Sequence, residues 1–415
     1  MQPTDIVILS NGPGEVVTWV RPVVRCLGKI KERSPDLRIS VLLSPCPHST
    51  GLEVAIASSY SQVDRVLPAE DFFEFLLWGK TPDNWQWHQR GIVVFLGGDQ
   101  FYTVAISRRL GYSSLIYAEW DARWYRWVDR FAAMNQKVID RIPQAYRHKF
   151  SLVGDLMADV ALEVEERSRS KPGATIGLLV GSKPAKLFQG VPLCLAIAEK
   201  IQQQQPQTQF IIPVAPTLDL SSLSKYANRQ DNPLVSSLGN VEAQLITSST
   251  QAPYLITSGG TKIQLITEFP AYKTLVNCQL CLTTVGANTA ELTALAVPMI
   301  VLLPTQQLDA MRSWDGLPGI LAGLPGVGTV FAKLINWVVL RQGRLFAWPN
   351  IWANKEIVPE LVGKLEPETV ARLVLNYLKH PDRLSAMRDL LRAVRGTTGA
   401  AEQIADIIKQ EITKI

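Results

Sequence analysis

The stretch "CQLCLTTVGANTAELTALAVPMIVLLP", residues 278–304, decides the fold class of this chain. It begins with an apolar run, passes through Gly286 and Asn288 into a helical segment with a single acid, Glu291, and ends in a second apolar run. An apolar strand, a glycine turn, a helix and another apolar strand make one β-α-β unit. Such uninterrupted apolar runs are typical of parallel strands that helices cover on both faces. The stretch therefore predicts the α/β class.

The same alternation of apolar runs and amphipathic segments extends over the whole chain. Because 415 residues are too many for one ordinary core, the sequence predicts two Rossmann-like domains that face a cleft. The charged, then Pro-Gly-containing segment "EVEERSRSKPGAT" (163–175) lacks periodicity and is the expected linker, which gives domains of residues 1–170 and 171–385. The predicted strands are residues 5–10, 38–44, 91–97, 113–118, 174–182, 208–215, 279–286 and 298–304.

Composition restricts the class of protein further. With 47% hydrophobic and 19% charged residues, the chain is globular and not disordered. A net charge of +5 suits a nucleotide or an anionic membrane surface but is too small to indicate nucleic-acid binding. Five cysteines describe no disulfide framework, and neither a signal peptide nor an apolar run long enough to span a bilayer is recognisable. We expect a cytoplasmic protein that is at most peripheral to the inner face of a membrane.

The pair Cys278 and Cys281 raises the question of a redox or metal motif. A redox CxxC lies at a helix N-terminus, whereas this one lies in a predicted strand. Zinc would need further ligands, and the chain has four histidines and no second CxxC. We therefore expect two buried apolar thiols and no metal site.

Three glycine-containing turns join a predicted strand to a predicted helix. In "TTVGANTAEL" (283–292), Gly286, Asn288 and Thr289 would offer backbone donors to a phosphate, and Glu291 would accept from ribose hydroxyls. The alternative is that Asn288 or Thr289 only caps the helix. The other turns are "ILSNGPGEVVTW" (8–19), with Gly12, Gly14 and Glu15, and "LLVGSKPAKL" (178–187), with Gly181, Ser182 and Lys183.

The distribution of these turns over two α/β halves is what a nucleotide cleft between two Rossmann-like domains requires. None of them has the spacing of a Walker A loop or of a GxGxxG fingerprint. Kinase and NAD-dependent chemistry are therefore disfavoured.

Several segments are similar to those of one family. The chain resembles the lipid-A-disaccharide synthases, GT-B glycosyltransferases that join a UDP-activated acylated glucosamine to an acylated sugar phosphate. The most specific match is "WPNIWANKEIVPELV" (348–362), which is close to that family's "LPNILAGREIVPELLQ". The other matching segments are "GPGE" (12–15), "SLVGDLMAD" (151–159), "LLVGSK" (178–183), "IPVAPTL" (212–218) and "TTVGANTAEL" (283–292).

The resemblance implies a GT-B fold in which residues from about 386 to 415 return to the N-terminal domain. It implies a UDP-sugar donor bound by the C-terminal domain, a lipid-linked sugar acceptor at the N-terminal domain, and no cofactor or metal. Asn350 and Glu360 are nucleotide-site residues by resemblance, although a helix cap and a solvated charge are the alternatives. A homodimer is compatible with the sequence.

The departures from the family concern charged residues. Lys183 replaces the arginine of the family's "LLPGSR", and the acid that follows is replaced around Lys186. The family's "DAPDF" segment, with the presumed catalytic aspartate, is "GGDQF" (97–101) here. Inverting transfer needs a general base, and Asp99 is the nearest carboxylate, with Glu15 as the reserve candidate. The alternative is that Asp99 is an ordinary turn residue.

Two aromatic segments suggest where an acyl chain is held. In "AEDFFEFLLWGKTPDNWQWH" (69–88), Phe72, Phe73 and Trp78 crowd a short helix and would contact a membrane surface. "EWDARWYRWVDRF" (119–131) interleaves tryptophans with arginines and would line the acceptor site. Core packing, or stacking on a base, would explain both segments equally.

Three functions follow from these observations. The leading one is a membrane-peripheral glycosyltransferase that uses a UDP-sugar and a lipid-linked acceptor with inversion. A catalytically silent nucleotide-sugar-binding or scaffold protein is the alternative that Lys183 and "GGDQF" suggest. A UDP-sugar epimerase of the same architecture is the third, and the "PN…VPEL" match is evidence against it.

Overall fold

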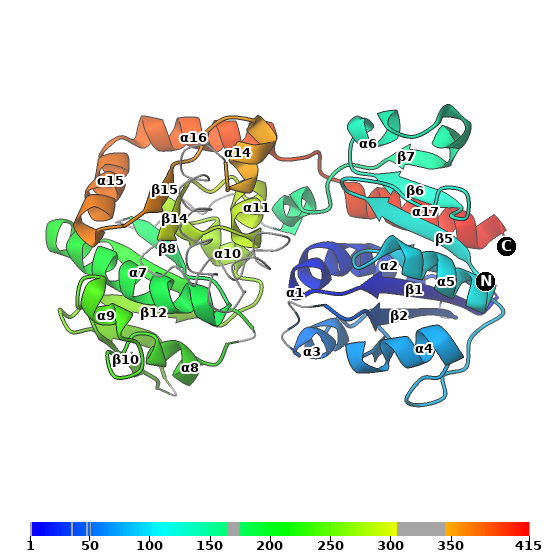
Figure 1. Ribbon diagram of the computed structural model, residues 1–415, viewed down its shortest axis with the longest axis horizontal. Helices are drawn as coiled ribbons and strands as arrows, with labels where there is room; N and C mark the ends of the chain where they lie inside the picture. Colours follow the sequence, from blue (N-terminus) through cyan, green and yellow to red (C-terminus); the bar gives the residue numbers. More distant parts are fainter. Residues whose placement is uncertain are drawn as a thin grey trace, which may run out of the picture. The chain divides into compact units, whose positions relative to one another are not determined.

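The computed structural model describes residues 2–34, 36–46, 49, 51–163, 174–216, 218–248, 250–304 and 345–414 (Figure 1). The chain divides into two compact units, one of Met1–Glu163 with Gly396–Ile415 and one of Val164–Arg395. The first unit thus ends seven residues before the expected 170, and the chain returns to it at Gly396 instead of about 386. The greater part of the expected linker (163–175) and the Gly- and Pro-rich stretch 306–327 lie outside the described residues.

The first unit contains one seven-stranded sheet, in the order β3-β2-β1-β4-β5-β6-β7. All of its strand pairs are parallel, as the apolar runs predict. Three of its strands are only three or four residues long, too short to show a period in the sequence. The strands are β1 (Thr4–Ser10), β2 (Leu37–Leu43), β3 (Arg65–Leu67), β4 (Arg90–Phe95), β5 (Ser113–Ala118), β6 (Arg130–Ala133) and β7 (Phe150–Leu152).

Helices cover this sheet, and one of them comes from the C-terminal end of the chain. Helix α17 (Ala400–Lys414) lies beside α2 (Arg21–Lys31), and its isoleucines enter the core that β1 and β2 share with α2 (Figure 1). The expected return of the C-terminal helix is confirmed. The other helices of the unit are α1 (Pro13–Glu15), which continues as a π-helix (Val16–Val20), α3 (Glu53–Ser58), α4 (Phe72–Trp78), α5 (Gln100–Leu110) and α6 (Gln136–Asp140).

The segment "SLVGDLMAD" holds the returning chain in place. The Asp159 carboxylate accepts from the backbone N–H groups of Gly399 and Ala401 at the start of α17. Gly154 has φ +94, and a Cβ there would meet the Thr397 carbonyl oxygen at 2.7 Å, so only glycine allows this approach. This family-like motif therefore joins the C-terminal helix to the first unit.

The second unit contains one eight-stranded sheet, in the order β10-β11-β12-β9-β8-β13-β14-β15. The β10–β11 and β11–β12 pairs are antiparallel and the others are parallel. The strands are β8 (Thr175–Leu179), β9 (Gln209–Pro213), β10 (Ala243–Ile246), β11 (Tyr254–Thr257), β12 (Lys262–Ile266), β13 (Leu280–Thr284), β14 (Met299–Pro304) and β15 (Glu360–Gly363). The helices are α7 (Pro184–Gln204), α8 (Leu220–Lys225), α9 (Leu234–Ser237), α10 (Tyr272–Leu275), α11 (Ala287–Ala294), α14 (Trp348–Ala353), α15 (Pro367–Lys379) and α16 (Pro381–Val394).

Both sulfurs of the CxxC pair lie in the core of this unit. Cys278 and Cys281 are fully buried and unbridged, and a Cβ on Gly177 of the neighbouring strand would meet the Cys281 Sγ at 2.6 Å. Burial raises the pKa of the Cys281 thiol well above its usual value. The prediction of buried apolar thiols is confirmed.

Each sheet has one point at which its strand order reverses. In the first sheet β2 and β4 flank β1, so the order reverses between β1 and β4; in the second it reverses between β8 and β13. Open α/β sheets bind ligands outside the carboxyl ends of the strands at this switch point. The four turns that follow β1, β4, β8 and β13 are therefore where a functional site is expected.

Candidate functional site

The switch point of the first unit brings Glu15 against the turn that follows β4. A Cβ on Gly97 (φ +139) would lie 3.2 Å from the Cβ and Cγ of Glu15, and one on Gly12 would lie 2.5 Å from Glu15 Oε2. Gly97 thus leaves the space that the base of the Glu15 side chain occupies, which together with its positive φ explains this glycine, whereas Gly12 faces only the flexible carboxylate end of Glu15. Gly14 has open space around its Cα, and its carbonyl oxygen accepts from the Thr18 hydroxyl at 2.8 Å.

Asp99 lies at the same edge, directly after β4. It is the N-cap of α5, and its Oδ1 accepts from the Phe101 N–H at 2.8 Å. The side chain is exposed, so the capping bond leaves the carboxylate in contact with solvent. Asp99 is therefore a helix cap and not the ordinary turn residue of the alternative, in a position that also suits a general base.

A third acid, Glu119, follows β5 at this edge and was not among the candidates from sequence. Burial raises its pKa to about 8, with repulsion from Asp155 and Glu15 adding to the rise. Buried Gln100 ties this segment to the start of α5, since it donates to the Asp121 carbonyl at 3.1 Å and accepts from the Arg123 N–H at 2.8 Å. The signal in the sequence is an acid placed directly after an apolar strand, which the resemblance did not mark.

The switch point of the second unit brings a lysine between two glycine turns. Lys186, on α7, donates from Nζ to the Val285 carbonyl oxygen at 2.6 Å. A Cβ on Gly181 would lie 3.1 Å from the Lys186 Cβ and Cδ, and one on Gly286 (φ +141) would lie 3.0 Å from Nζ. The predicted phosphate turns after β8 and β13 are thus adjacent, and the Lys186 side chain lies between them.

The other residues predicted to bind a nucleotide at the turns after β8 and β13 differ in how far they are buried. Ser182 is exposed, and Lys183 is the partly buried N-cap residue of α7. Glu291 is partly buried on α11, and burial raises its pKa to about 7. Asn288 is partly buried, and the N-cap of α11 is Gly286 without a side-chain capping bond, so the capping alternative for Asn288 is wrong.

Thr289, Asn350 and Glu360 form one internal hydrogen-bond network. The buried Thr289 hydroxyl donates to Gly286 O at 2.9 Å and accepts from the Trp348 N–H at 3.2 Å. Asn350, also fully buried, donates to Val358 O and to the Glu360 carboxylate and accepts from two backbone N–H groups. The Glu360 carboxylate also accepts from the N–H groups of Phe346 and Ala347 before α14.

This network revises the roles taken from the resemblance. The described contacts account for the Thr289 hydroxyl and for all four hydrogen bonds that the Asn350 amide can make. Their side chains are buried, so they position α14 and the turn before α11 and do not present donors to a nucleotide. The specific "PN…VPEL" segment is thus a structural motif in this chain.

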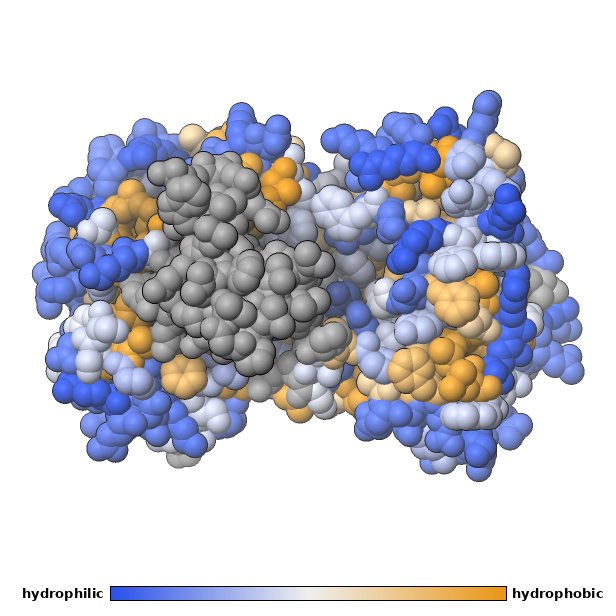
Figure 2. Space-filling model, in the orientation of Figure 1, coloured by the Kyte–Doolittle hydropathy of each residue, from blue (hydrophilic) through white to orange (hydrophobic). Residues whose placement is uncertain are grey.

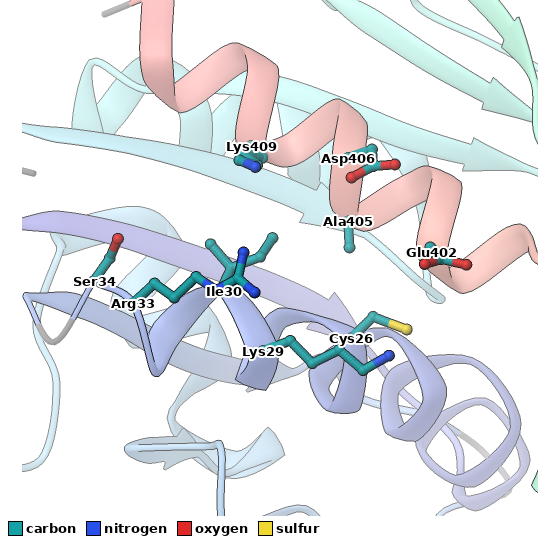
Figure 3. A pocket seen from close by; sticks show the side chains of 9 residues that line it. All are labelled: Cys26, Lys29, Ile30, Arg33, Ser34, Glu402, Ala405, Asp406 and Lys409. Carbon is teal, nitrogen blue, oxygen red and sulfur yellow. The ribbon is translucent and has the colours of Figure 1, made fainter.

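A surface pocket of about 270 Å³ lies away from both switch points, between α2 and α17 (Figure 3). Its charged side chains have both signs and are exposed, and none belongs to a strand end. It therefore differs from the nucleotide site expected at a sheet edge. Its lining residues are Cys26, Lys29, Ile30, Arg33, Ser34, Glu402, Ala405, Asp406 and Lys409.

The part of the chain that the structure describes contains no group of three or more His, Cys, Asp or Glu side chains arranged to hold a metal ion. Over the same residues, no helix combines the length and apolar character that crossing a membrane requires.

The aromatic segment 69–88 divides into a buried and an exposed face. Phe72 and Phe75 are fully buried, so the prediction that Phe72 contacts a membrane is wrong: its ring packs in the core at 4.9 Å from that of Tyr102. Phe73 and Trp78 are 47% and 66% exposed, as expected of a contact surface. Apolar side chains gather on the surface of the first unit over α4 and α5 (Figure 2). We call the exposed set the aromatic ridge: Phe73, Leu77, Trp78, Phe101, Trp120 and Trp127.

Comparison with known proteins identifies relatives of this chain. No protein-family model matches it. Lipid-A-disaccharide synthase of Nitrosococcus oceani is 23% identical over 230 residues, 55% of this chain and 46% of that protein. The enzyme of the same name from Syntrophus aciditrophicus is 24% identical over 266 residues, 61% of this chain and 56% of that protein. The chain is a divergent relative of the lipid-A-disaccharide synthases.

The relationship is partial in length. The chain spans about half the length of the first curated relatives it matches. The segments that resemble this family include the glycine turns at the switch points and the internal hydrogen-bond network around Asn350.

Solved structures give the fold. A Listeria monocytogenes structure assigned as a UDP-N-acetylglucosamine 2-epimerase is 13% identical and superposes with a TM-score of 0.52 over 100% of this chain and 98% of that chain. The UDP complex of MnaA from S. aureus is 11% identical, with a TM-score of 0.52 over 99% and 98%. At such identities the likeness shows the fold alone, which is GT-B.

Proposed function

We propose that this chain is a glycosyltransferase that transfers a sugar from a UDP-sugar to a lipid-linked acceptor, with inversion, at a membrane surface. The observation that supports it most is the chemical difference between the two switch points. Two acids follow neighbouring strands of the first unit (Glu15 and Asp99), whereas lysines and glycine turns follow β8 and β13 of the second. Acids suit proton removal from an acceptor, and cations suit a leaving diphosphate.

The division of roles follows from the groups present. Asp99 would take the proton of the acceptor hydroxyl as the bond to the anomeric carbon forms. Lys183 and the backbone of the glycine turns would bind the diphosphate as the glycosidic bond to it breaks. Glu291 would accept hydrogen bonds from the ribose.

An assay for transfer separates this proposal from its two rivals. The full chain is incubated with a panel of UDP-sugars and a total lipid extract, and UDP and new glycolipids are followed by mass spectrometry. The proposal predicts UDP release together with a glycolipid heavier by one sugar. A new UDP-sugar formed without lipid would indicate the epimerase, which the shared fold of the Listeria structure favours. Binding of a UDP-sugar without any product would indicate the silent binding protein.

The ionisation of Glu291 gives a pH-dependent prediction. Because its pKa is raised to about 7, the carboxylate is mainly protonated below that pH and ionised above it. Only the ionised form accepts from both ribose hydroxyls, so affinity for uridine should rise between about pH 6 and pH 8. Glu291→Gln should weaken binding by about 1–3 kcal/mol at pH 8 and remove the pH dependence. Calorimetric titration with uridine at several pH values measures this pH dependence. Uridine is used because the phosphate of a nucleotide would itself titrate at about pH 6.

Unchanged affinity in Glu291→Gln at pH 8, in a variant with wild-type stability, would refute the ribose role. Glu268→Gln, which changes one carboxyl in the same unit outside the turns after β8 and β13, is the control and should leave uridine binding unaltered.

The aromatic ridge supports the membrane part of the proposal. Phe73 contacts Tyr102 at the start of α5, with ring centroids 6.5 Å apart. Arg109 donates to the carbonyl oxygens of Leu76 and Leu77 at the end of α4, and the Arg108 guanidinium lies 5.4 Å from the Trp127 ring. Exposed aromatic rings beside fixed cations are what an interface with anionic lipid needs.

Replacing Phe73, Leu77 and Trp78 with Ser should reduce partitioning onto anionic liposomes at least about tenfold, because each ring or chain loses apolar burial in the lipid. Co-sedimentation measures the effect. A double variant at two exposed leucines elsewhere, Leu152→Ser with Leu390→Ser, is the control and should sediment like the wild type. If the wild type stays in the supernatant with anionic liposomes, the membrane role is refuted.

A further inference from the structure

Asn11, at the switch point of the first unit, has a side chain that makes no hydrogen bond within the described residues. It directly follows β1 and is half-buried. Its Oδ1 is enclosed and without a partner there, whereas its Nδ2, which takes part in no described hydrogen bond either, stays accessible. Because an enclosed polar group without a partner lowers stability, the Asn11 carboxamide does not stabilise the turn in which it lies.

A second asparagine at the same edge of the sheet has the structural role that Asn11 lacks. Asn135 closely follows β6 and is half-buried like Asn11. Its Oδ1 accepts from the Val138 N–H at 3.3 Å and thereby caps α6. Two parallel strands of one sheet are thus followed by the same residue type, once bonded to a helix and once unbonded. Support of the fold therefore explains Asn135 and does not explain Asn11.

The surroundings of the Asn11 carboxamide are those of a binding position. Its Oδ1 lies 3.1 Å from the point that a Cβ on Gly97 would occupy, and the Cβ and Cγ of Glu15 lie 3.2 Å from the same point. A Cβ on Gly98, the residue before Asp99, would lie 3.9 Å from the Asn11 Cβ. Asn11 therefore lies beside Glu15 and beside the turn that leads to the proposed general base.

The chemistry of these groups favours an uncharged ligand that carries hydroxyls. Asn11 supplies an N–H donor, whereas Glu15 and Asp99 supply acceptors. A phosphate would meet two acidic side chains and one neutral donor, which disfavours an anion. A hydroxyl both donates and accepts, so a sugar ring with neighbouring hydroxyls can bond the carboxamide and a carboxylate together.

We propose that Asn11 binds the sugar ring of the acceptor, its Nδ2 donating to a hydroxyl next to the one from which Asp99 takes the proton. This inference rests on the proposed function. It assigns the first switch point to an uncharged edge of the acceptor sugar and not to a phosphate of the acceptor. The Asn11 carboxamide then contributes to acceptor affinity and has no part in binding the UDP-sugar.

Initial rates of transfer by the full chain, with the total lipid extract as acceptor and saturating UDP-sugar, test this assignment. Asn11→Ala should raise the lipid concentration that gives half the maximal rate about three- to tenfold, as expected for one neutral hydrogen bond. The half-saturating concentration of UDP-sugar should stay at the wild-type value. Asn11→Leu, which has a similar size but no N–H donor, should behave in the same way.

Thermal unfolding of the same variants separates acceptor binding from support of the fold. Asn11→Ala removes no described hydrogen bond, so its unfolding midpoint should lie within about 2 °C of the wild type. Asn135→Ala is the matched control, because it removes the cap of α6. Its unfolding midpoint should fall by about 2–4 °C, while both half-saturating concentrations stay at the wild-type values.

Three results would overturn the assignment, and each has a different meaning. If the wild type transfers sugar and Asn11→Ala needs no more lipid than the wild type, Asn11 does not bind the acceptor and the proposed function stands. If Asn11→Ala raises both half-saturating concentrations and lowers the unfolding midpoint as much as Asn135→Ala, the residue supports the turn and not the acceptor. If the wild type forms no glycolipid, the proposed function is refuted and this inference with it.

Discussion

Asp99→Asn should reduce turnover by about 10²–10⁴-fold while leaving affinity for the UDP-sugar nearly unchanged. Asparagine keeps an oxygen that can accept from the Phe101 N–H, so the cap of α5 is retained. It cannot accept a proton from the acceptor hydroxyl. The measurement is single-turnover transfer together with calorimetric UDP-sugar binding, which separates chemistry from affinity.

Two neighbouring acids are the controls for this result. Glu119, with its pKa raised to about 8, is mainly protonated at pH 7, so Glu119→Gln resembles its resting form and should keep most activity. Near-normal turnover in Asp99→Asn, combined with inactive Glu15→Gln, would move the base to Glu15. Asp99 would then have a structural role only.

Asn350→Ala should lower the free energy of unfolding of the second unit by about 3–5 kcal/mol. The substitution removes four buried hydrogen bonds and leaves two N–H groups, one carbonyl and the Glu360 carboxylate without this partner. Urea denaturation, followed by a probe in the second unit, measures the loss. UDP affinity of the folded protein should change little, because the amide is buried and fully bonded within the chain.

Asn288→Ala is the matched control, with the opposite pattern. Asn288 makes no side-chain hydrogen bond within the part of the chain that the structure describes, so stability should stay near the wild-type value. Its loss should weaken UDP if it contacts the diphosphate. A stable Asn350→Ala variant with weakened UDP binding would contradict the structural role of the "PN…VPEL" segment.

The architecture followed from the sequence because long buried strands leave a strong signal. All eight predicted apolar runs are strands, and the glycine turns after β1, β4, β8 and β13 lie at the two switch points. The short strands β3, β6 and β7 left no period to detect. The antiparallel β10–β12 group, of four- and five-residue strands, was missed for the same reason.

The site was only partly predictable because local sequence patterns do not determine which side chains are buried or which distant residues they contact. Phe72 and Phe73 are neighbours, yet Phe72 is fully buried and Phe73 is 47% exposed. Consecutive residues of a helix point to different faces, and only the packing of α4 on the sheet decides which face is buried. Asn350 matched a family motif, but the motif could not show that its amide is bonded internally. Lys186 acquires its position from Val285, which only the pairing of β8 with β13 brings near.

The proposed function requires a nucleotide to bind at the switch point between β8 and β13. Hydrogen–deuterium exchange of the full chain, with and without saturating UDP, tests it most directly because it reports on each backbone segment. We expect slower exchange in residues 181–187 and 284–292 on addition of UDP. Protection confined to the turns after β1 and β4, or none in the second unit, would contradict it.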